Sequence, residues 1–267
     1  MNDKTARLMV TITALFLIIS GAVLYMVFTK QGISKNNLNN YKHYDINDYI
    51  EVTPIVYDDY SSVYNEINVS KINIKNIDEK LIKDFIEQEK EIIGYINGYY
   101  NEIVANVNYT PINTASSTIK SQINDTILSI YYNLKFELDP QIFSENIKNY
   151  TIVLNIDLGT NKVLTNDDLL NKYNYEKEYI AEKIFNDEIL IEKGQIVIDK
   201  NTNMSLTSND IFRKKNKYID DIITEFDNII YLYTENNTLV MTYDSKELKN
   251  LFFDNIFDTN IKFKYLK

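Results

Sequence analysis

The sequence NYTIVLNIDLGTNKVLTNDDLL, at Asn149–Leu170, combines a strand, a turn and a helix start. Its apolar first half predicts a strand over Asn149–Leu158. Gly159–Lys162 is typical of a turn, after which Val163 and Leu164 pair back on the strand. Thr165 is followed three residues later by Asp168, in the place where a capping box usually has Glu or Gln, and this spacing predicts a helix start.

Similar signals extend outward from this stretch in both directions. The other predicted strands are Ile50–Tyr57, Glu66–Lys75, Leu128–Phe136 (led into by Ile119–Ile127), Ile229–Tyr233, Leu239–Tyr243 and Ile261–Tyr265. The predicted helices are Asp78–Ile103, Glu176–Asn186, one from Ser208 or Asn209 to about Thr224, and a short one from Ser245. Strands that meet through hairpins, with helices packed on one side, predict an α+β fold with antiparallel sheets.

The helix predicted over Asp78–Ile103 has the strongest apolar periodicity in the chain, and Asp78 is placed to cap it. Gly94 and Gly98 lie on or near its apolar side, and we expect them to allow close packing on a sheet. The alternative is a dimer face of the small-xxx-small kind, which is described mainly for membrane helices.

A run of 21 uncharged residues, Leu8–Phe28, predicts a transmembrane helix that precedes the folded part. Ser20-Gly21-Ala22 could be a signal-peptidase site, but mostly apolar residues continue beyond it, so we interpret the run as an uncleaved anchor. The positive charges that flank the run are nearly balanced. Because the tail before it is too short to fold, we expect that tail in the cytoplasm and the C-terminal domain outside the cell membrane.

The charge and composition exclude several classes of function. Residues 1–30 carry a net +2, from Lys4, Arg7 and Lys30 against Asp3, which leaves −12 on the remainder of a chain whose net charge is −10. That balance disfavours nucleic acid and anionic lipid surfaces as partners. Cysteine is absent and His43 is the only histidine, in a polar segment, so we predict no cofactor, no metal and no catalysis.

Carboxylates and tyrosines leave other possibilities open. Acidic residues are plentiful, so a carboxylate-dependent cell-wall hydrolase is the enzymatic alternative. The segments Asp199–Asp210 and Asp157–Asp168 resemble calcium loops, but the sixth position of the first is Met204, and we interpret both as turns and helix caps. The 22 tyrosines suggest glycan stacking, yet they mostly alternate along strands and more readily fill core and rim; Tyr131 and Tyr132 face opposite sides of one strand.

The run NIDLGTNKVLTNDDL, at Asn155–Leu169, resembles the signature hairpin NxDLxTGKxLTxxDL of a Gram-positive extracytoplasmic domain. That domain forms the outer part of the anti-sigma factor RsiV and precedes the catalytic domain of PdaC-type peptidoglycan deacetylases. The resemblance covers roughly 119–267, and 50–107 more loosely. The matching motif residues are Asn155, Asp157, Leu158, Thr160, Lys162, Leu164, Asp168 and Leu169.

Three departures limit what the resemblance implies. Asn161 replaces the glycine of the family's turn, although Asn also tolerates positive φ. Glu137–Lys148 replaces a Gly-Gly-Ala-His loop, and we expect neither a sigma-binding segment nor a deacetylase domain. The resemblance therefore implies a binding or sensing module alone, which recognises a wall glycan or a wall-directed protein such as lysozyme. The other alternative is a structural partner of another membrane protein.

The predicted organisation follows from these observations. It comprises a cytoplasmic tail (1–7), a transmembrane anchor (8–28), a polar stalk (29–48), the N-terminal half of an extracytoplasmic domain (49–118) and its RsiV/PdaC-like C-terminal half (119–267). We predict binding in the loop Glu137–Lys148, because loops on a rigid sheet commonly carry recognition. Phe143 is the predicted anchor there, beside Asp139 and Glu145, unless its ring folds back on the sheet.

Overall fold

A computed structural model of the chain describes residues 43–56, 66–105, 112–138, 141, 147–254 and 261–266. The chain divides after Tyr44 into two units, and the architecture below belongs to the second, Asp45–Lys267. No helix among the described residues is long and apolar enough to cross a membrane. The predicted tail, the anchor Leu8–Phe28 and most of the predicted stalk lie outside the described residues, so they remain predictions.

The elements follow one another along the chain with short connections. In chain order they are η1 (Ile46–Asp48), β1 (Ile50–Pro54), β2 (Glu66–Asn68), β3 (Ser70–Ile74), α2 (Glu79–Ala105), β4 (Ile112–Asn124), β5 (Ile127–Leu138), β6 (Ile147–Asp157), β7 (Lys162–Val163), α3 (Asn166–Tyr173), α4 (Lys177–Ile184), η2 (Phe185–Ile189), β8 (Ile196–Asp199), β9 (Ser205–Thr207), α5 (Ser208–Arg213), α6 (Lys215–Thr224), α7 (Phe226–Ile229), β10 (Tyr231–Glu235), β11 (Thr238–Asp244), α8 (Ser245–Asn250), β12 (Phe253–Asp254) and β13 (Ile261–Tyr265).

The central sheet has five strands in the order β2-β4-β5-β6-β7. All its neighbours are antiparallel except β2 and β4, which are parallel. β5 lies in the middle and is almost entirely buried, because both of its faces are covered. The two faces carry alternate residues: Tyr132 packs in the core with α2, whereas Tyr131 stacks on Tyr233 of β10, with ring centroids 5.3 Å apart.

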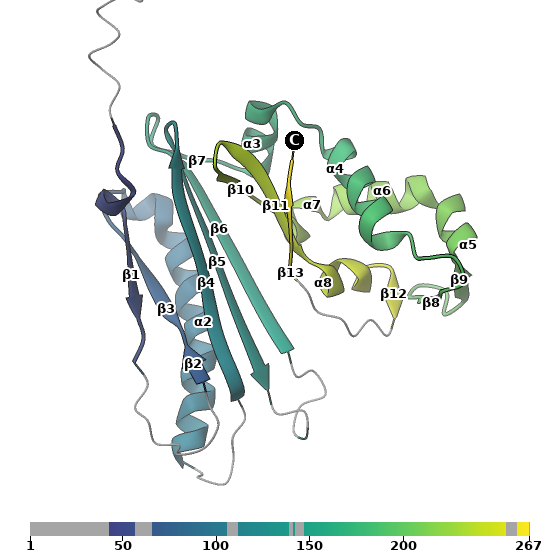
Figure 1. Ribbon diagram of the computed structural model, residues 1–267, viewed down its shortest axis with the longest axis horizontal. Helices are drawn as coiled ribbons and strands as arrows, with labels where there is room; N and C mark the ends of the chain where they lie inside the picture. The colour runs from purple at the N-terminus through teal and green to yellow at the C-terminus, as the bar shows by residue number, and fades with distance from the viewer. Residues whose placement is uncertain are drawn as a thin grey trace, which may run out of the picture. The chain divides into compact units, whose positions relative to one another are not determined.

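The long helix α2 runs along one face of this sheet (Figure 1). Asp78 caps it, since its Oδ1 accepts from the Lys80 backbone N–H at 3.0 Å. Buried side chains recur every three or four residues along the helix and pack against the even-numbered residues of β5 and β6. They are Ile82, Phe85, Glu89, Ile92 and Ile96.

The antiparallel sheet β10-β11-β13 covers the opposite face of the central sheet (Figure 1). Side chains of the central sheet form hydrogen bonds with backbone groups on the outer edge of β10. Asn155 Nδ2 donates to Leu232 O at 2.8 Å, and the Thr234 N–H donates to Ser129 Oγ at 3.0 Å. Asn155 also accepts from Ser129 Oγ at 2.6 Å, so these buried polar groups join the two sheets.

The second hydrophobic core lies on the other face of β10 and β11. Leu232, Leu239, Met241 and Tyr243 are fully buried there against helices that include α4, α6 and α8. A small sheet, β12-β8-β9, extends this unit. The predicted α+β class with antiparallel sheets and helices is therefore confirmed. The prediction that the helices pack on one side is wrong, because α2 packs on the central sheet whereas α4, α6 and α8 pack on the β10-β11-β13 sheet.

Several local predictions are confirmed. Thr165 and Asp168 form a reciprocal capping box at the start of α3. Asn161 has a φ of 55°, as expected for its turn. Tyr131 and Tyr132 face opposite sides of β5, and both are buried in packing.

Other predictions are wrong at specific points. Gly94 and Gly98 are exposed, with nothing within 4 Å of a Cβ built on either, because each lies two residues, about 200°, past a buried isoleucine. The segment before Leu128 is a separate strand, β4, since Asp125 has a φ of 54° and turns the chain. The strand predicted over Glu66–Lys75 divides at Val69 between two sheets.

Candidate functional site

The binding loop predicted from the sequence cannot be compared with the structure. Asp139, Phe143 and Glu145 lie outside the described residues. β5 ends at Leu138 and β6 begins at Ile147, so the loop does join two core strands, as expected. Its role in binding stays a prediction.

The residues of the family-like motif shape the turn between β6 and α3. Asp157 Oδ1 accepts from the Gly159 N–H at 2.9 Å, and Lys162 Nζ lies 3.0 Å from Asp168 Oδ1. Hydrogen bonds from the Thr165 backbone N–H and from Lys162 hold the pKa of Asp168 below its ordinary value. The motif's leucines are packed in or against the cores, and Thr160 is exposed; these leucines are Leu158, Leu164 and Leu169.

The two calcium-like segments are turns and helix caps, as predicted. Asp199 Oδ1 accepts from the N–H groups of Asn201 and Thr202, at 3.0 and 2.9 Å. Asp210 forms a capping box with Thr207. Within the described ranges no group of three or more His, Cys, Asp or Glu residues is placed to hold a metal ion.

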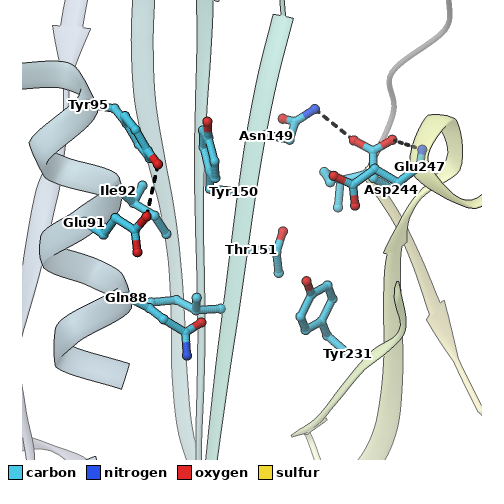
Figure 2. Close-up of a pocket in the computed structure, with 12 residues that line it drawn as sticks. Gln88, Glu91, Ile92, Tyr95, Asn149, Tyr150, Thr151, Tyr231, Asp244 and Glu247 are labelled. Atoms are coloured by element: carbon cyan, nitrogen blue, oxygen red, sulfur yellow. Dashed lines mark hydrogen bonds between the residues drawn. The ribbon is translucent and has the colours of Figure 1, made fainter. Parts of the chain in front are cut away.

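The most site-like feature is a cleft between α2, the outer edge of β6 and the β10–β11–α8 region, which we call the edge cleft (Figure 2). Its volume is about 220 Å³. Its lining residues are Gln88, Glu91, Ile92, Tyr95, Asn149, Tyr150, Thr151, Ile152, Tyr231, Asp244, Glu247 and Ile261. The cleft continues along β6 into a second groove, with which it shares Gln88, Ile152 and Tyr231.

One wall of the edge cleft carries two carboxylates at the start of α8. Asp244 is 6% exposed and caps the helix, because its Oδ1 accepts from the N–H groups of Lys246 and Glu247 at 2.7 and 3.3 Å. Its Oδ2 accepts from Asn149 Nδ2 of β6 at 3.1 Å (Figure 2). Glu247 is exposed at its surface, but partial desolvation by its surroundings, and then the neighbouring Asp244, raise its pKa. Burial, followed by the charge of Glu247, also raises the pKa of Tyr231.

The opposite wall combines a third carboxylate with stacked aromatic rings. Tyr95 donates its hydroxyl to Glu91 Oε1 at 3.0 Å (Figure 2). Its ring stacks on Tyr150 with centroids 5.4 Å apart, and Tyr150 stacks in turn on Phe136 at 5.7 Å. Tyr95 is 42% exposed, so its ring forms the rim of the cleft above a buried aromatic column.

The lining defines what the cleft accepts. Its charged side chains are Glu91, Asp244 and Glu247, and no lysine, arginine or histidine lines it within the part of the chain that the structure describes. Carboxylates beside tyrosine rings favour a cationic group or a ligand rich in hydrogen-bond donors. These residues come from segments far apart in the sequence. Each acidic residue lies in a segment that is typical of an exposed acidic side chain, so the sequence alone did not reveal the site.

Two buried hydroxyl groups lie between the sheets, next to residues of the cleft and its adjoining groove. Thr242 is paired across the hairpin with Tyr231, and Tyr131 is paired with Val153. Neither Thr242 Oγ1 nor Tyr131 Oη makes a hydrogen bond of good geometry among the described residues, although the hydroxyls of Thr151 and Thr242 lie near enough to the Tyr131 hydroxyl to oppose the rise of its pKa. Burial raises the pKa of Tyr131 to about 12, so its hydroxyl stays neutral.

Comparisons with known proteins add little to this geometry. No family profile and no curated protein sequence matches the chain. Among solved structures, the chain is similar to a member of the DUF3298 family from Bacteroides fragilis, with 13% identity over 81% of this chain and 90% of that chain. The TM-score is 0.27, which is too low to support an argument about the fold or the family.

Proposed function

We propose that this protein is a non-catalytic recognition module of the cell envelope, anchored in the membrane by Leu8–Phe28 with its folded domain outside the cell. The edge cleft carries the proposal, because three carboxylates and three tyrosines line it and no basic residue is among its described lining residues. The resemblance of Asn155–Leu169 to the RsiV and PdaC-type domains supports the same assignment. The ligand is a wall glycan or a basic wall-directed protein such as lysozyme.

The acidic balance of the chain favours the basic protein among these ligands. The part beyond residue 30 carries −12, and such a field attracts a cationic partner and makes its association depend on salt. The carboxylates of the cleft are negative as well, so they would contact the cationic groups of such a partner directly. A glycan would instead stack on Tyr95 and Tyr150 and respond weakly to salt.

A specific observation bears on the enzymatic alternative. Asp244 and Glu247 form a carboxylate pair in which one pKa is raised, as acid–base hydrolases require. However, both groups sit on one wall of the cleft, and Asp244 already accepts hydrogen bonds from two backbone N–H groups and from Asn149. A base or nucleophile that is committed to capping a helix is poorly placed to react, which favours binding.

Calorimetry with the full chain in detergent tests the binding proposal, with lysozyme and soluble wall fragments as probes at two salt concentrations. We expect lysozyme to bind and its affinity to fall with salt. The double variant Glu91→Gln/Glu247→Gln should lower this affinity at least about tenfold, whereas Glu178→Gln/Glu192→Gln, acids that do not line the cleft, should not. Loss of affinity in Phe143→Ala but not in the cleft variant would move the site to the Glu137–Lys148 loop. Failure of both probes to bind would overturn the proposal.

Two further experiments test the orientation in the membrane and the absence of catalysis. Protease treatment of intact protoplasts should digest the folded domain, and a protected domain would reverse the orientation. A zymogram on cell-wall substrate should show no clearing by the full chain. Clearing that disappears in Glu247→Gln would establish the hydrolase instead.

A further inference from the structure

We propose that the edge cleft receives an extended peptide segment of a partner protein, which joins β6 as an added strand and places a Lys or Arg side chain among the carboxylates. The inference rests on the proposed function, and it names the partner class and the mode of binding for the same cleft. In strand addition, backbone hydrogen bonds supply affinity and alternate side chains supply selectivity.

The outer edge of β6 is open over most of its length. β5 pairs with the whole strand on one side, but on the other side β7 reaches only Ile156 and Asp157. Backbone polar groups of successive residues point to opposite sides of a strand. The Leu164 N–H donates to Asn155 O at 2.8 Å on the β7 side, so the backbone groups of Asn155 face outward.

The same alternation directs the backbone groups of Asn149, Thr151 and Val153 outward. On the inner side, Asn133 Nδ2 donates to Tyr150 O at 3.2 Å, toward β5, which is consistent with this assignment. No hydrogen bond joins the outward groups of the three residues to any other part of the described chain. All three residues line the edge cleft or its adjoining groove, so a row of donors and acceptors without partners among the described residues faces this space.

The outer edge of β10 differs from that of β6. The outer edge of β10 is satisfied by side chains: Leu232 O accepts from Asn155 Nδ2, and the Thr234 N–H donates to Ser129 Oγ. No comparable side chain reaches the outward groups of Thr151 among the described residues. Exposed edges are ready templates for an added strand, and this one lies inside a cleft.

The flanking walls define the side chains that the added strand would carry. On β6, the Asn149 side chain faces Asp244 and the Tyr150 ring faces Tyr95 (Figure 2). Side chains of an added strand would alternate between the same two walls. A cationic side chain of the added strand would meet a carboxylate on whichever wall it faces, because Glu91 lies on one wall and Glu247 on the other. No basic residue is among the described lining residues.

Other occupants fit this edge less well. A second copy of the chain would have to bring its own β6 edge within about 4.8 Å, the spacing of paired strands. Each edge lies between α2 and the β10–β11–α8 region, so the walls of the two copies would meet first. A glycan lacks the repeating N–H and C=O groups that match a strand edge. A single extended peptide meets both requirements.

Residue-resolved amide exchange on the full chain in detergent micelles tests the mode of binding. The probe is a synthetic peptide of about seven residues, a common strand length, that alternates threonine and valine around a central lysine. We expect at least about tenfold slower exchange at the amides of Asn149, Thr151 and Val153 on binding. The amides of Tyr150 and Ile152, which face β5, should be slow already and unchanged. Uniform or absent protection along β6 would overturn strand addition.

A matched pair of variants at one position tests the backbone contact directly. Thr151→Pro removes an outward N–H without removing a bond to β5 and should weaken peptide binding about tenfold. Thr151→Ala keeps that N–H and loses the same hydroxyl, which accepts from Asn133 Nδ2 at 3.0 Å, so the proline variant should bind the peptide about tenfold more weakly than the alanine variant. The exchange pattern in the wild type remains decisive if the proline variant fails to fold.

Two further experiments test the charge contact and distinguish failure of strand addition from failure of the proposed function. Glu247→Gln should lower affinity for the lysine peptide but not for one with a central glutamate, while Glu192→Gln should change neither. If lysozyme or wall fragments bind and the alternating protection is absent, strand addition fails and the recognition function stands. If lysozyme, wall fragments and the lysine peptide all fail to bind, both proposals fail.

Discussion

Replacement of Asn155 by alanine should separate a structural role of the family-like motif from a role in binding. Asn155 is 5% exposed, donates to Leu232 O at 2.8 Å and accepts from Ser129 Oγ at 2.6 Å. Asn155→Ala leaves a buried carbonyl oxygen without a partner, which costs about 1–3 kcal/mol, and loses a further bond of about 1 kcal/mol. Ser129 keeps its contact with Thr234, so the loss is confined to these two interactions. We therefore expect the free energy of unfolding to fall by about 3 kcal/mol.

Urea unfolding of the fragment Asp45–Lys267, followed by far-UV circular dichroism because the chain has no tryptophan, measures this loss. In a domain of this size the same change lowers Tm by roughly 6–12 °C. Thr160→Ala is the control within the motif: Thr160 is exposed and its hydroxyl interacts with Asp157 at the surface, so its replacement should cost about 1 kcal/mol at most. A loss below about 1 kcal/mol for Asn155→Ala, with an unchanged m-value, would refute the reasoning and reopen a ligand-binding role for this residue.

Two other predictions concern buried groups outside the motif. Burial raises the pKa of Glu89, whose Oε1 accepts from the Ile72 N–H at 2.6 Å, so the native state holds this proton more tightly than the unfolded state. The contribution of Glu89 to stability should then fall as pH rises above about 4.5, whereas carboxylates with a lowered pKa, such as Asp168, act in the opposite sense. Relative to the wild type, Glu89→Gln should therefore be more stable at pH 7 but not at pH 4. Urea unfolding of both proteins at both pH values checks this, and a constant difference would contradict it. Thr242→Val removes a buried hydroxyl that makes no hydrogen bond of good geometry among the described residues and should raise stability by about 1 kcal/mol; a lower Tm would mean that this hydroxyl is bonded, to the nearby Tyr131 hydroxyl or through water.

Local signals in the sequence predicted the elements that local physics determines. The capping box at Thr165 and Asp168, the turn at Asn161 and the cap at Asp78 each depend on contacts within a few residues, and each is present. Errors arose where neighbouring residues gave no clear boundary. Asp125 turns the chain between β4 and β5 in a segment that is otherwise strand-like on both sides.

The candidate site could not be predicted because no local pattern encodes it. The three carboxylates of the cleft lie on different elements: Glu91, Asp244 and Glu247. The neighbours of each in the sequence are typical of an exposed acidic side chain. Their convergence depends on how the two sheets stack, which in turn depends on buried contacts such as that between Asn155 and Leu232. The spacing of residues within one strand or helix carries no information of this kind.

The open edge of β6 nevertheless has a local cause. β7 ends at Val163 because Thr165 becomes the N-cap of α3, and the capping box with Asp168 directs the chain away from the sheet. A return strand that continued for a few more residues would have paired with Thr151 and Val153 and filled the cleft. Isolated edges of this kind are usually blunted, and here α2 and the β10–β11–α8 region flank the edge on its two sides. The position of one helix cap thus leaves the backbone groups that the proposed ligand would use.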